Sequence, residues 1–159
     1  MISRLGFATH CAVRRLCSKK HSVCAPGRPT LPNPPVISII EDDGSVRAAT
    51  HNLVRSLGYV VHTFASAEEF LQSPQLDDTS CVIADVQMPT MSGIDLQAHL
   101  LAEGYRVPFI FMTAFSEESA RARAPKAGAT AFLTKPFNGD DLVKCLGAAL
   151  DGRGDGTRE

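Results

Sequence analysis

Short apolar runs alternate with segments of helical periodicity along residues 36–150. A short run rich in β-branched and aromatic residues, bounded by glycine or polar residues, is typical of a strand buried on both faces of a parallel sheet. Such runs predict five strands, at residues 36–40, 59–63, 81–84, 107–112 and 130–134.

The segments between these strands have the spacing of amphipathic helices. The first places four apolar residues on one face and ends at a glycine: Val46, Ala49, Leu53, Leu57 and Gly58. Ser66 is expected to cap a short second helix, because Glu69 follows it at the spacing of a capping box. Further helices are predicted at residues 94–102, 117–126 and 140–150.

The alternation of strands and helices predicts an α/β protein. Short connections between them are typical of right-handed βαβ units, which build a parallel sheet covered by helices on both faces. In such folds a ligand binds beyond the carboxyl ends of the strands, where the strand order reverses. The residues at those ends are therefore the candidates for function.

Ionisable and hydroxyl side chains follow four of the predicted strands. The chain places three acids after the first strand, one after the third, a threonine after the fourth and a lysine after the fifth: Glu41, Asp42, Asp43, Asp85, Thr113 and Lys135. Clustered carboxylates repel one another unless a cation lies among them, and Mg²⁺ prefers oxygen ligands. Without a metal, Lys135 would balance the charge of Asp85.

Asp85 is predicted to be the reacting group. Aspartate carboxylates act as nucleophiles and form aspartyl-phosphates. A metal to bridge oxygens, a lysine to neutralise charge and a hydroxyl to bind the remaining oxygens are what phosphoryl transfer requires. The residues at the strand ends supply these groups.

Charge is unevenly distributed along the chain, although the formal net charge is only −1. Residues 1–35 carry six basic residues and no acid, whereas residues 36–159 carry ten basic residues and all 17 acids, a net charge of −7. The near-zero total argues against a protein that binds nucleic acid over its whole surface. No apolar run approaches the roughly 18 residues of a membrane span.

Residues 26–35 contain five of the ten prolines, which favours an extended linker. We predict a disordered, basic, proline-rich extension at residues 1–35, a globular domain at residues 36–150 and a disordered tail at residues 151–159. Organellar targeting, metal binding and nucleic-acid contact are the alternatives for the extension. Its three cysteines are separated by five and six residues, which does not match the usual zinc spacing. No disulfide framework is expected, and we predict a cytoplasmic protein.

Five segments carry a resemblance to a known family. They are residues 39–43 (IIEDD), 83–89 (IADVQMP), 91–93 (MSG), 111–114 (FMTA) and 133–137 (LTKPF). In this order and at this spacing they resemble the signatures of the response-regulator receiver domain of two-component systems. Residues 64–71 and 126–129 resemble the FixJ-type subgroup. The resemblance covers residues 36–150.

The resemblance implies a flavodoxin-like (βα)5 three-layer sandwich with strand order 2-1-3-4-5. It also implies that Asp85 is the phosphoacceptor, which takes a phosphoryl group from a histidine kinase or a phosphotransfer protein with Mg²⁺, or Mn²⁺ in its place. Asp42 would be a direct metal ligand and Glu41 would act largely through water. Asp85 and the backbone carbonyl of Gln87 would complete the protein ligands.

The resemblance further implies a set of switch residues. Thr113 and Ala114 would bind a phosphoryl oxygen, and Lys135 would pair with the phosphoryl group. A cis bond before Pro136 would place the ammonium over the site. Phe132 stands where the family has a rotating aromatic ring, and the alternative for it is an ordinary core residue of the strand.

Two departures from the family pattern affect the predicted partners. Pro125 lies near the end of the predicted fourth helix and should shorten or bend it, because it lacks a backbone donor. That helix belongs to the helix 4–strand 5–helix 5 face, through which the family binds output proteins or forms homodimers. The chain also ends soon after residue 150, without the DNA-binding domain typical of FixJ-type regulators.

We therefore expect a stand-alone receiver with an unidentified output protein, no direct contact with nucleic acid or membrane, and at most slow self-catalysed phosphotransfer and dephosphorylation. The alternatives are an N-terminal fragment of a FixJ/LuxR-type transcriptional regulator and a receiver-like interaction module that is never phosphorylated. A phosphohydrolase is disfavoured, because Gln87 stands where that class commonly has a second aspartate.

Overall fold

The computed structural model describes residues 33–114, 118, 122 and 129–151. Three predicted features lie outside these residues: the extension up to residue 32, most of the helix at residues 117–126 with its Pro125, and the tail from residue 152. The strands and helices named below lie within the described residues.

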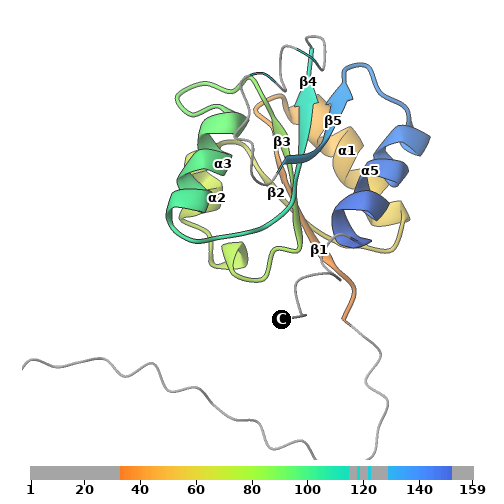
Figure 1. Cartoon of the computed structure of the whole chain (residues 1–159). Coiled ribbons are helices and arrows are strands. Elements are labelled where there is room, and N and C mark those ends of the chain that lie inside the picture. Colours follow the sequence, from red (N-terminus) through yellow and green to blue (C-terminus); the bar gives the residue numbers. More distant parts are fainter. Residues whose placement is uncertain (1–32, 115–117, 119–121, 123–128, 152–159) are drawn as a thin grey trace, which may run out of the picture. The chain divides into compact units, whose positions relative to one another are not determined.

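Five parallel strands form one sheet at the centre of the domain (Figure 1). They are β1 (Val36–Ile40), β2 (Val60–Phe64), β3 (Cys81–Asp85), β4 (Phe109–Thr113) and β5 (Ala129–Thr134), and they pair in the order β2-β1-β3-β4-β5. This confirms the α/β class and the strand order. Because the order reverses between β1 and β3, the carboxyl ends of these two strands border one crevice.

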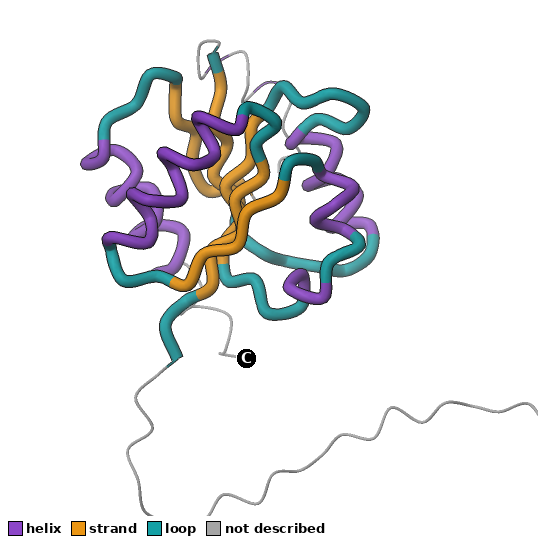
Figure 2. Tube along the Cα trace, turned by 180° about the vertical axis from the view of Figure 1, so that it is seen from behind, coloured by secondary structure: helices purple, strands orange, loops and turns teal. Residues whose placement is uncertain are grey.

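Helices cover both faces of the sheet (Figures 1 and 2). They are α1 (Gly44–Ser56), α2 (Ala67–Leu71), α3 (Gly93–Ala102) and α5 (Gly139–Asp151), with a 3-10 turn at Pro74–Leu76. Side chains of α2 and α3 pack with Phe109 and Phe111 of β4 in one core cluster. Side chains of α1 and α5 pack with Ile110 and Met112 in a second. This alternation along β4 follows from the two-residue period of a strand.

The apolar face predicted for α1 is only partly buried. The buried residues of this helix are Thr50 and Val54, whereas Ala49 is exposed and Leu57 is 39% exposed. Thr50 can be buried because its hydroxyl donates a hydrogen bond to the carbonyl of Val46 at 2.9 Å. The side of α1 that faces the core is therefore not centred on its apolar stripe, and part of the stripe stays on the surface.

Two strands begin later than the sequence predicts. β2 begins at Val60 and β4 at Phe109, one and two residues later than predicted. Pro108 has no N–H to donate, and it precedes β4 with its carbonyl accepting from Val82 at 3.0 Å. Ser66 caps α2 as predicted, by accepting from the N–H of Glu69.

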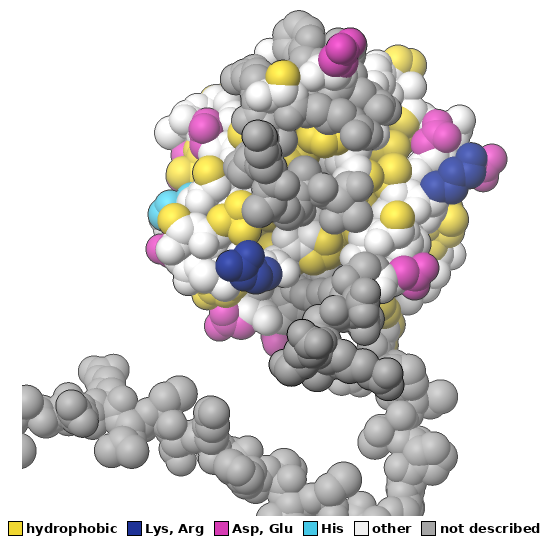
Figure 3. Space-filling view, in the orientation of Figure 1, with side chains coloured by type: hydrophobic (Ala, Val, Ile, Leu, Met, Phe, Trp, Pro, Cys, Tyr) yellow, Lys and Arg dark blue, Asp and Glu magenta, His cyan; other side chains and the backbone are white. Residues whose placement is uncertain are grey.

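One face of the domain has its charged side chains mainly near the edge. On the face seen in Figure 3, acidic side chains of the described residues lie around the edge, with hydrophobic side chains nearer the middle. Among the described residues, no helix is long and apolar enough to cross a bilayer.

Candidate functional site

The pairing register of the sheet brings the predicted acids together. Ile40 of β1 is the partner of Ala84 of β3, so the next residue on each strand, Glu41 and Asp85, lies at the same edge. Both strands are buried between the two core clusters, so a slip by one residue would move each of their side chains into the opposite cluster, where it does not fit. The packing of the core therefore brings Glu41 and Asp85 together, without any attraction between the two carboxylates.

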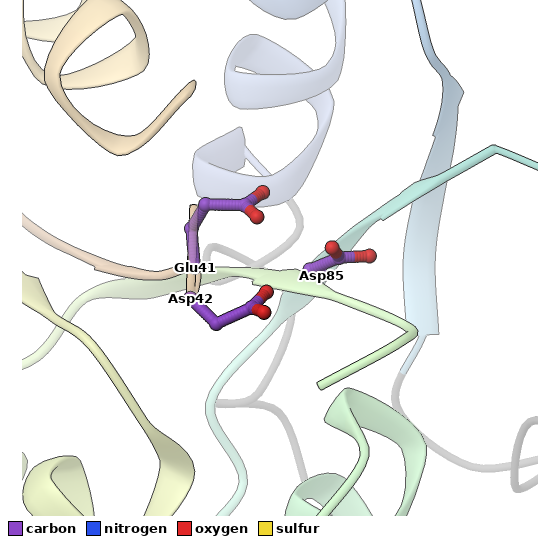
Figure 4. A group of neighbouring side chains, drawn as sticks. All are labelled: Glu41, Asp42 and Asp85. Carbon is purple, nitrogen blue, oxygen red and sulfur yellow. The ribbon is translucent and has the colours of Figure 1, made fainter. Parts of the chain in front are cut away.

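Three carboxylates form a cluster at this edge. Glu41, Asp42 and Asp85 each present one oxygen, and these oxygens lie within 4.8 Å of one another. Figure 4 shows Glu41 and Asp42 extending from neighbouring positions toward the side on which Asp85 lies. Glu41 is only 1% exposed and Asp85 7%, whereas Asp42 lies on the surface.

Lys135 joins the two buried acids. Its Nζ lies 2.8 Å from Oε2 of Glu41 and 2.9 Å from Oδ2 of Asp85. The lysine reaches them because Thr113 of β4 pairs with Thr134 of β5, and the N–H of Lys135 donates to the carbonyl of Thr113 at 2.7 Å. The ammonium supplies the positive charge that a pair of neighbouring buried carboxylates requires.

The ionisation of the cluster follows from burial and from this lysine. Burial raises the pKa of the Glu41 carboxyl, and the hydrogen bond from Lys135 offsets only part of that rise. Burial alone would lower the pKa of Lys135, but its hydrogen bonds to Glu41 and Asp85 outweigh the burial and raise it. Lys135 is therefore a cation throughout the physiological pH range.

The carboxylate of Asp42 accepts no hydrogen bond from the described residues and is free to bind a cation. Each carboxylate oxygen of Asp85 accepts one hydrogen bond from the described residues. Oδ1 accepts from the N–H of Gln87 at 3.0 Å, and Oδ2 accepts from Nζ of Lys135. Carboxylate oxygens with open coordination positions fit a hard divalent cation such as Mg²⁺. The backbone carbonyl of Gln87 as a further ligand stays a prediction.

Asp43 has the role of a helix start. Its Oδ1 accepts from the N–H of Val46 at 3.1 Å and from that of Ser45 at 2.8 Å, so it caps α1. These bonds to Val46 and Ser45 lower the pKa of the Asp43 carboxyl. Asp43 therefore caps the helix, whereas Glu41 and Asp42 belong to the carboxylate cluster.

The predicted switch residues lie along β4 and β5. Thr113 is buried at the end of β4, and Ala114 follows it on the surface. Phe132 is 8% exposed, and the centroid of its ring lies 5.4 Å from that of Phe111. The Lys135–Pro136 bond is cis, as predicted.

Two features of the site region were not predicted. Arg47 of α1 donates hydrogen bonds to the backbone carbonyls of Glu41 and Asp42. In addition, a largely apolar pocket of about 520 Å³ opens between α1 and the residues that follow β5. Its wall includes Val46, Ala49 and Leu53 of the apolar stripe of α1, of which Leu53 also packs against the second core cluster.

Comparison with known proteins identifies the family. Residues 37–147 match the model of the response regulator receiver domain. The chain therefore belongs to the receiver domains of response regulators, which act in two-component systems and interact with histidine kinases and output domains. Receiver domains bind Mg²⁺ at an acidic pocket, and the cluster of Glu41, Asp42 and Asp85 is the corresponding group of acids here.

Similar proteins include regulators of the predicted subgroup. The chain is 40% identical over 116 residues to Nodulation protein W of Bradyrhizobium diazoefficiens, which covers 73% of this chain and 51% of that protein. It is 42% identical over 115 residues to the response regulator TodT of Pseudomonas putida, covering 72% of this chain and 51% of TodT. The chain thus spans about half the length of these curated relatives.

A solved structure supports the same assignment. The crystal structure of FixJ-N matches with a TM-score of 0.66 and 28% sequence identity, over 74% of this chain and 94% of that one. The predicted FixJ-type receiver family is therefore confirmed.

Proposed function

We propose that the chain is a phosphoacceptor, in which Asp85 takes a phosphoryl group from a phosphohistidine of a kinase or a phosphotransfer protein. The observation that carries this proposal is the arrangement at the carboxyl ends of β1, β3 and β5. One carboxylate, Asp85, is held by Lys135 and by the N–H of Gln87 beside the free carboxylate of Asp42. Such a group is fixed in place and has its charge partners ready before a substrate arrives.

The proposed transfer is a displacement at phosphorus. An oxygen of Asp85 attacks the phosphorus, the P–N bond to the donor imidazole breaks, and its electron pair leaves with the nitrogen. Lys135 then turns from the carboxylate toward the new phosphoryl oxygens, whose negative charge it neutralises. Asp42 and Asp85, with the carbonyl of Gln87 and a water held by Glu41, would bind Mg²⁺ or Mn²⁺, which supplies further charge neutralisation.

Phosphorylation from a small donor tests this function. The whole chain, incubated with acetyl phosphate and Mg²⁺, should gain the mass of one phosphoryl group, and EDTA should abolish the gain because the carboxylate cluster then lacks its cation. Intact-mass spectrometry and peptide mapping measure the product and its position. Labelling that is independent of metal would contradict the proposed site, and a chain that is never labelled would be a receiver-like interaction module.

We further propose that phosphorylation switches the β5 surface. A phosphoryl oxygen would draw the hydroxyl of Thr113, with the N–H of Ala114 as a second donor, and the movement would change the space beside Phe132. The ring of Phe132 packs on Phe111, and Phe132 is one of the residues that line a pocket of about 330 Å³ between β5 and α5. In this proposal the ring has two places, the observed one and a second one that it takes after phosphorylation. A reversal from 1:99 to 99:1 between two such states requires about 5.5 kcal/mol.

Nuclear magnetic resonance of the beryllofluoride-treated protein tests the switch. Amide shifts are expected at Thr113, at Ala114 and around Phe132, since beryllofluoride occupies the place of the phosphoryl group. In Thr113→Ala the shifts around Phe132 should disappear, because the hydroxyl that couples them to Asp85 is gone. Shifts confined to the loops beside Asp85 would contradict the proposed route.

The output partner, or a second copy of the chain, would bind the surface of β5 and α5, on which Val143 is an exposed apolar side chain. In this proposal the chain works in the cytoplasm and binds neither nucleic acid nor membrane directly. It is not an enzyme in the usual sense, because Asp85 itself is consumed and is regenerated only by slow hydrolysis of the aspartyl-phosphate. Lys135, Asp42 and the metal would serve both steps.

A further inference from the structure

Arg47 binds the backbone of the acidic loop rather than its carboxylates. Its Nη1 donates to the carbonyl of Glu41 at 2.6 Å and to that of Asp42 at 3.3 Å. The residue lies in the first turn of α1 and is half-buried. Within the described part of the chain, the hydrogen bonds of its side chain go to these two carbonyl oxygens, so its positive charge interacts with main-chain dipoles next to the acids.

The segment from Glu41 to Asp43 is tied at three further places. The N–H of Glu41 donates to the carbonyl of Phe64 at 3.1 Å, and the N–H of Asp43 donates to Oε1 of Glu41 at 3.3 Å. The side chain of Asp43 caps α1. These contacts engage the N–H groups and side chains, whereas Arg47 is the group that holds the carbonyls of the two acids.

We propose that Arg47 is a positioning residue for the acidic pair, which holds the backbone of Glu41 and Asp42 so that their carboxylates converge with Asp85 on a divalent cation. The inference rests on the proposed function. Asp42 needs such a support, because its exposed carboxylate has no hydrogen-bond donor among the described residues. A charge-assisted hydrogen bond from a planar guanidinium is suited to fixing two adjacent carbonyls in one direction.

The positive charge of Arg47 has an opposite effect, which makes the inference testable. A cation close to the cluster repels Mg²⁺, so a purely electrostatic role predicts tighter metal binding when Arg47 is removed. A positioning role predicts weaker binding, because the Asp42 carboxylate then samples orientations that do not meet Asp85. The sign of the change in affinity therefore separates the two roles.

The experiment is a Mg²⁺ titration of the full chain without any phosphodonor, followed by the amide resonances around Asp42 and Asp85. Arg47→Ala should raise the dissociation constant about tenfold, and Arg47→Lys should lie between it and wild type, because an ammonium keeps the charge but holds one carbonyl at best. Arg55→Ala is the matched control, since Arg55 lies in the last turn of the same helix and is exposed. It should bind Mg²⁺ as wild type does.

A kinetic readout separates positioning from general damage. The rate of labelling by acetyl phosphate in Arg47→Ala should approach the wild-type rate once Mg²⁺ is saturating, while the Mg²⁺ concentration at half-maximal rate rises. Unchanged or tighter binding in Arg47→Ala, with normal binding by the wild type, would overturn the inference and leave the proposed function intact. Failure of the wild type to bind Mg²⁺ would overturn both. If Arg47→Ala does not fold, the comparison of Arg47→Lys with wild type decides.

Discussion

Asp85→Asn should abolish phosphorylation while leaving the domain folded. An amide has nearly the same size as the carboxylate, but it carries no negative charge and is a poor nucleophile toward phosphorus. Its oxygen still accepts the hydrogen bond from the N–H of Gln87, and Lys135 keeps Glu41 as a partner at 2.8 Å. We therefore expect labelling by acetyl phosphate or a donor kinase to fall below detection, with a melting temperature close to that of the wild type.

Asp78→Asn provides the matched control for this prediction. Asp78 is an exposed aspartate that precedes β3, at the opposite end of the strand from Asp85. The two variants have the same change of charge and the same change of side chain, so a difference between them reports position alone. Asp78→Asn should be labelled at the wild-type rate. Labelling of Asp85→Asn at that rate would show that another residue is the acceptor.

The strand ends could be predicted from sequence because their location depends on few rules. Apolar runs mark the buried strands, and parallel pairing puts the residues after them at one edge. Once Asp85 and Glu41 follow neighbouring strands, the register of Ile40 with Ala84 makes them meet. The hydrogen bonds of Lys135 to both acids were foreseen only in part, since the sequence pointed to Asp85 and the structure adds buried Glu41.

The face of α1 could not be predicted in the same way. An amphipathic stripe shows which side chains are apolar, and the structure buries Thr50 while it leaves Ala49 on the surface. The cost of burying a hydroxyl is small here because Thr50 bonds to the carbonyl of its own helix. Val46, Ala49 and Leu53 line an open pocket beside Lys135, although Leu53 also packs against the core. Periodicity alone does not tell a core face from the wall of a surface pocket.

Arg47 was missed for a different reason. A single basic residue near the start of a helix carries no sequence signal that separates a solvated side chain from one bound to main-chain carbonyls. Only the distances of its Nη1 to the carbonyls of Glu41 and Asp42 reveal the contact. Contacts of a side chain with the backbone depend on the exact path of a loop, which composition and spacing do not define.

The loop after Asp85 leads to the second large expected effect, at Gly93. This residue begins α3 and packs directly on β3. A Cβ at this position would lie 2.3 Å from the carbonyl oxygen of Asp85, 3.1 Å from its carbonyl carbon and 3.2 Å from the Cβ of Ala84. The two nearest atoms belong to the backbone of a central strand, so they cannot move aside as a flexible side chain would.

Gly93→Ala should therefore push the start of α3 away from β3 and displace the loop that carries Gln87. Overpacking at such a site costs about 3 kcal/mol, which corresponds to a loss of roughly 10 °C in melting temperature for a domain of this size. Phosphorylation of Asp85 should slow as well, because the N–H of Gln87 would no longer meet its Oδ1. Thermal and denaturant unfolding measure the first effect, and labelling by acetyl phosphate measures the second.

Gly147→Ala is the control, and its effect on stability should have the opposite sign. Gly147 lies inside α5, and a Cβ there would meet no atom within 4 Å outside its own helix and chain neighbours. Because glycine is a poor helix former, alanine at this position should stabilise the fold by about 0.5–1 kcal/mol. If the close approach to the Asp85 carbonyl is what requires glycine at residue 93, replacing glycine by alanine should destabilise the fold at the start of α3 and stabilise it within α5. Equal stability of Gly93→Ala and wild type would contradict this packing argument.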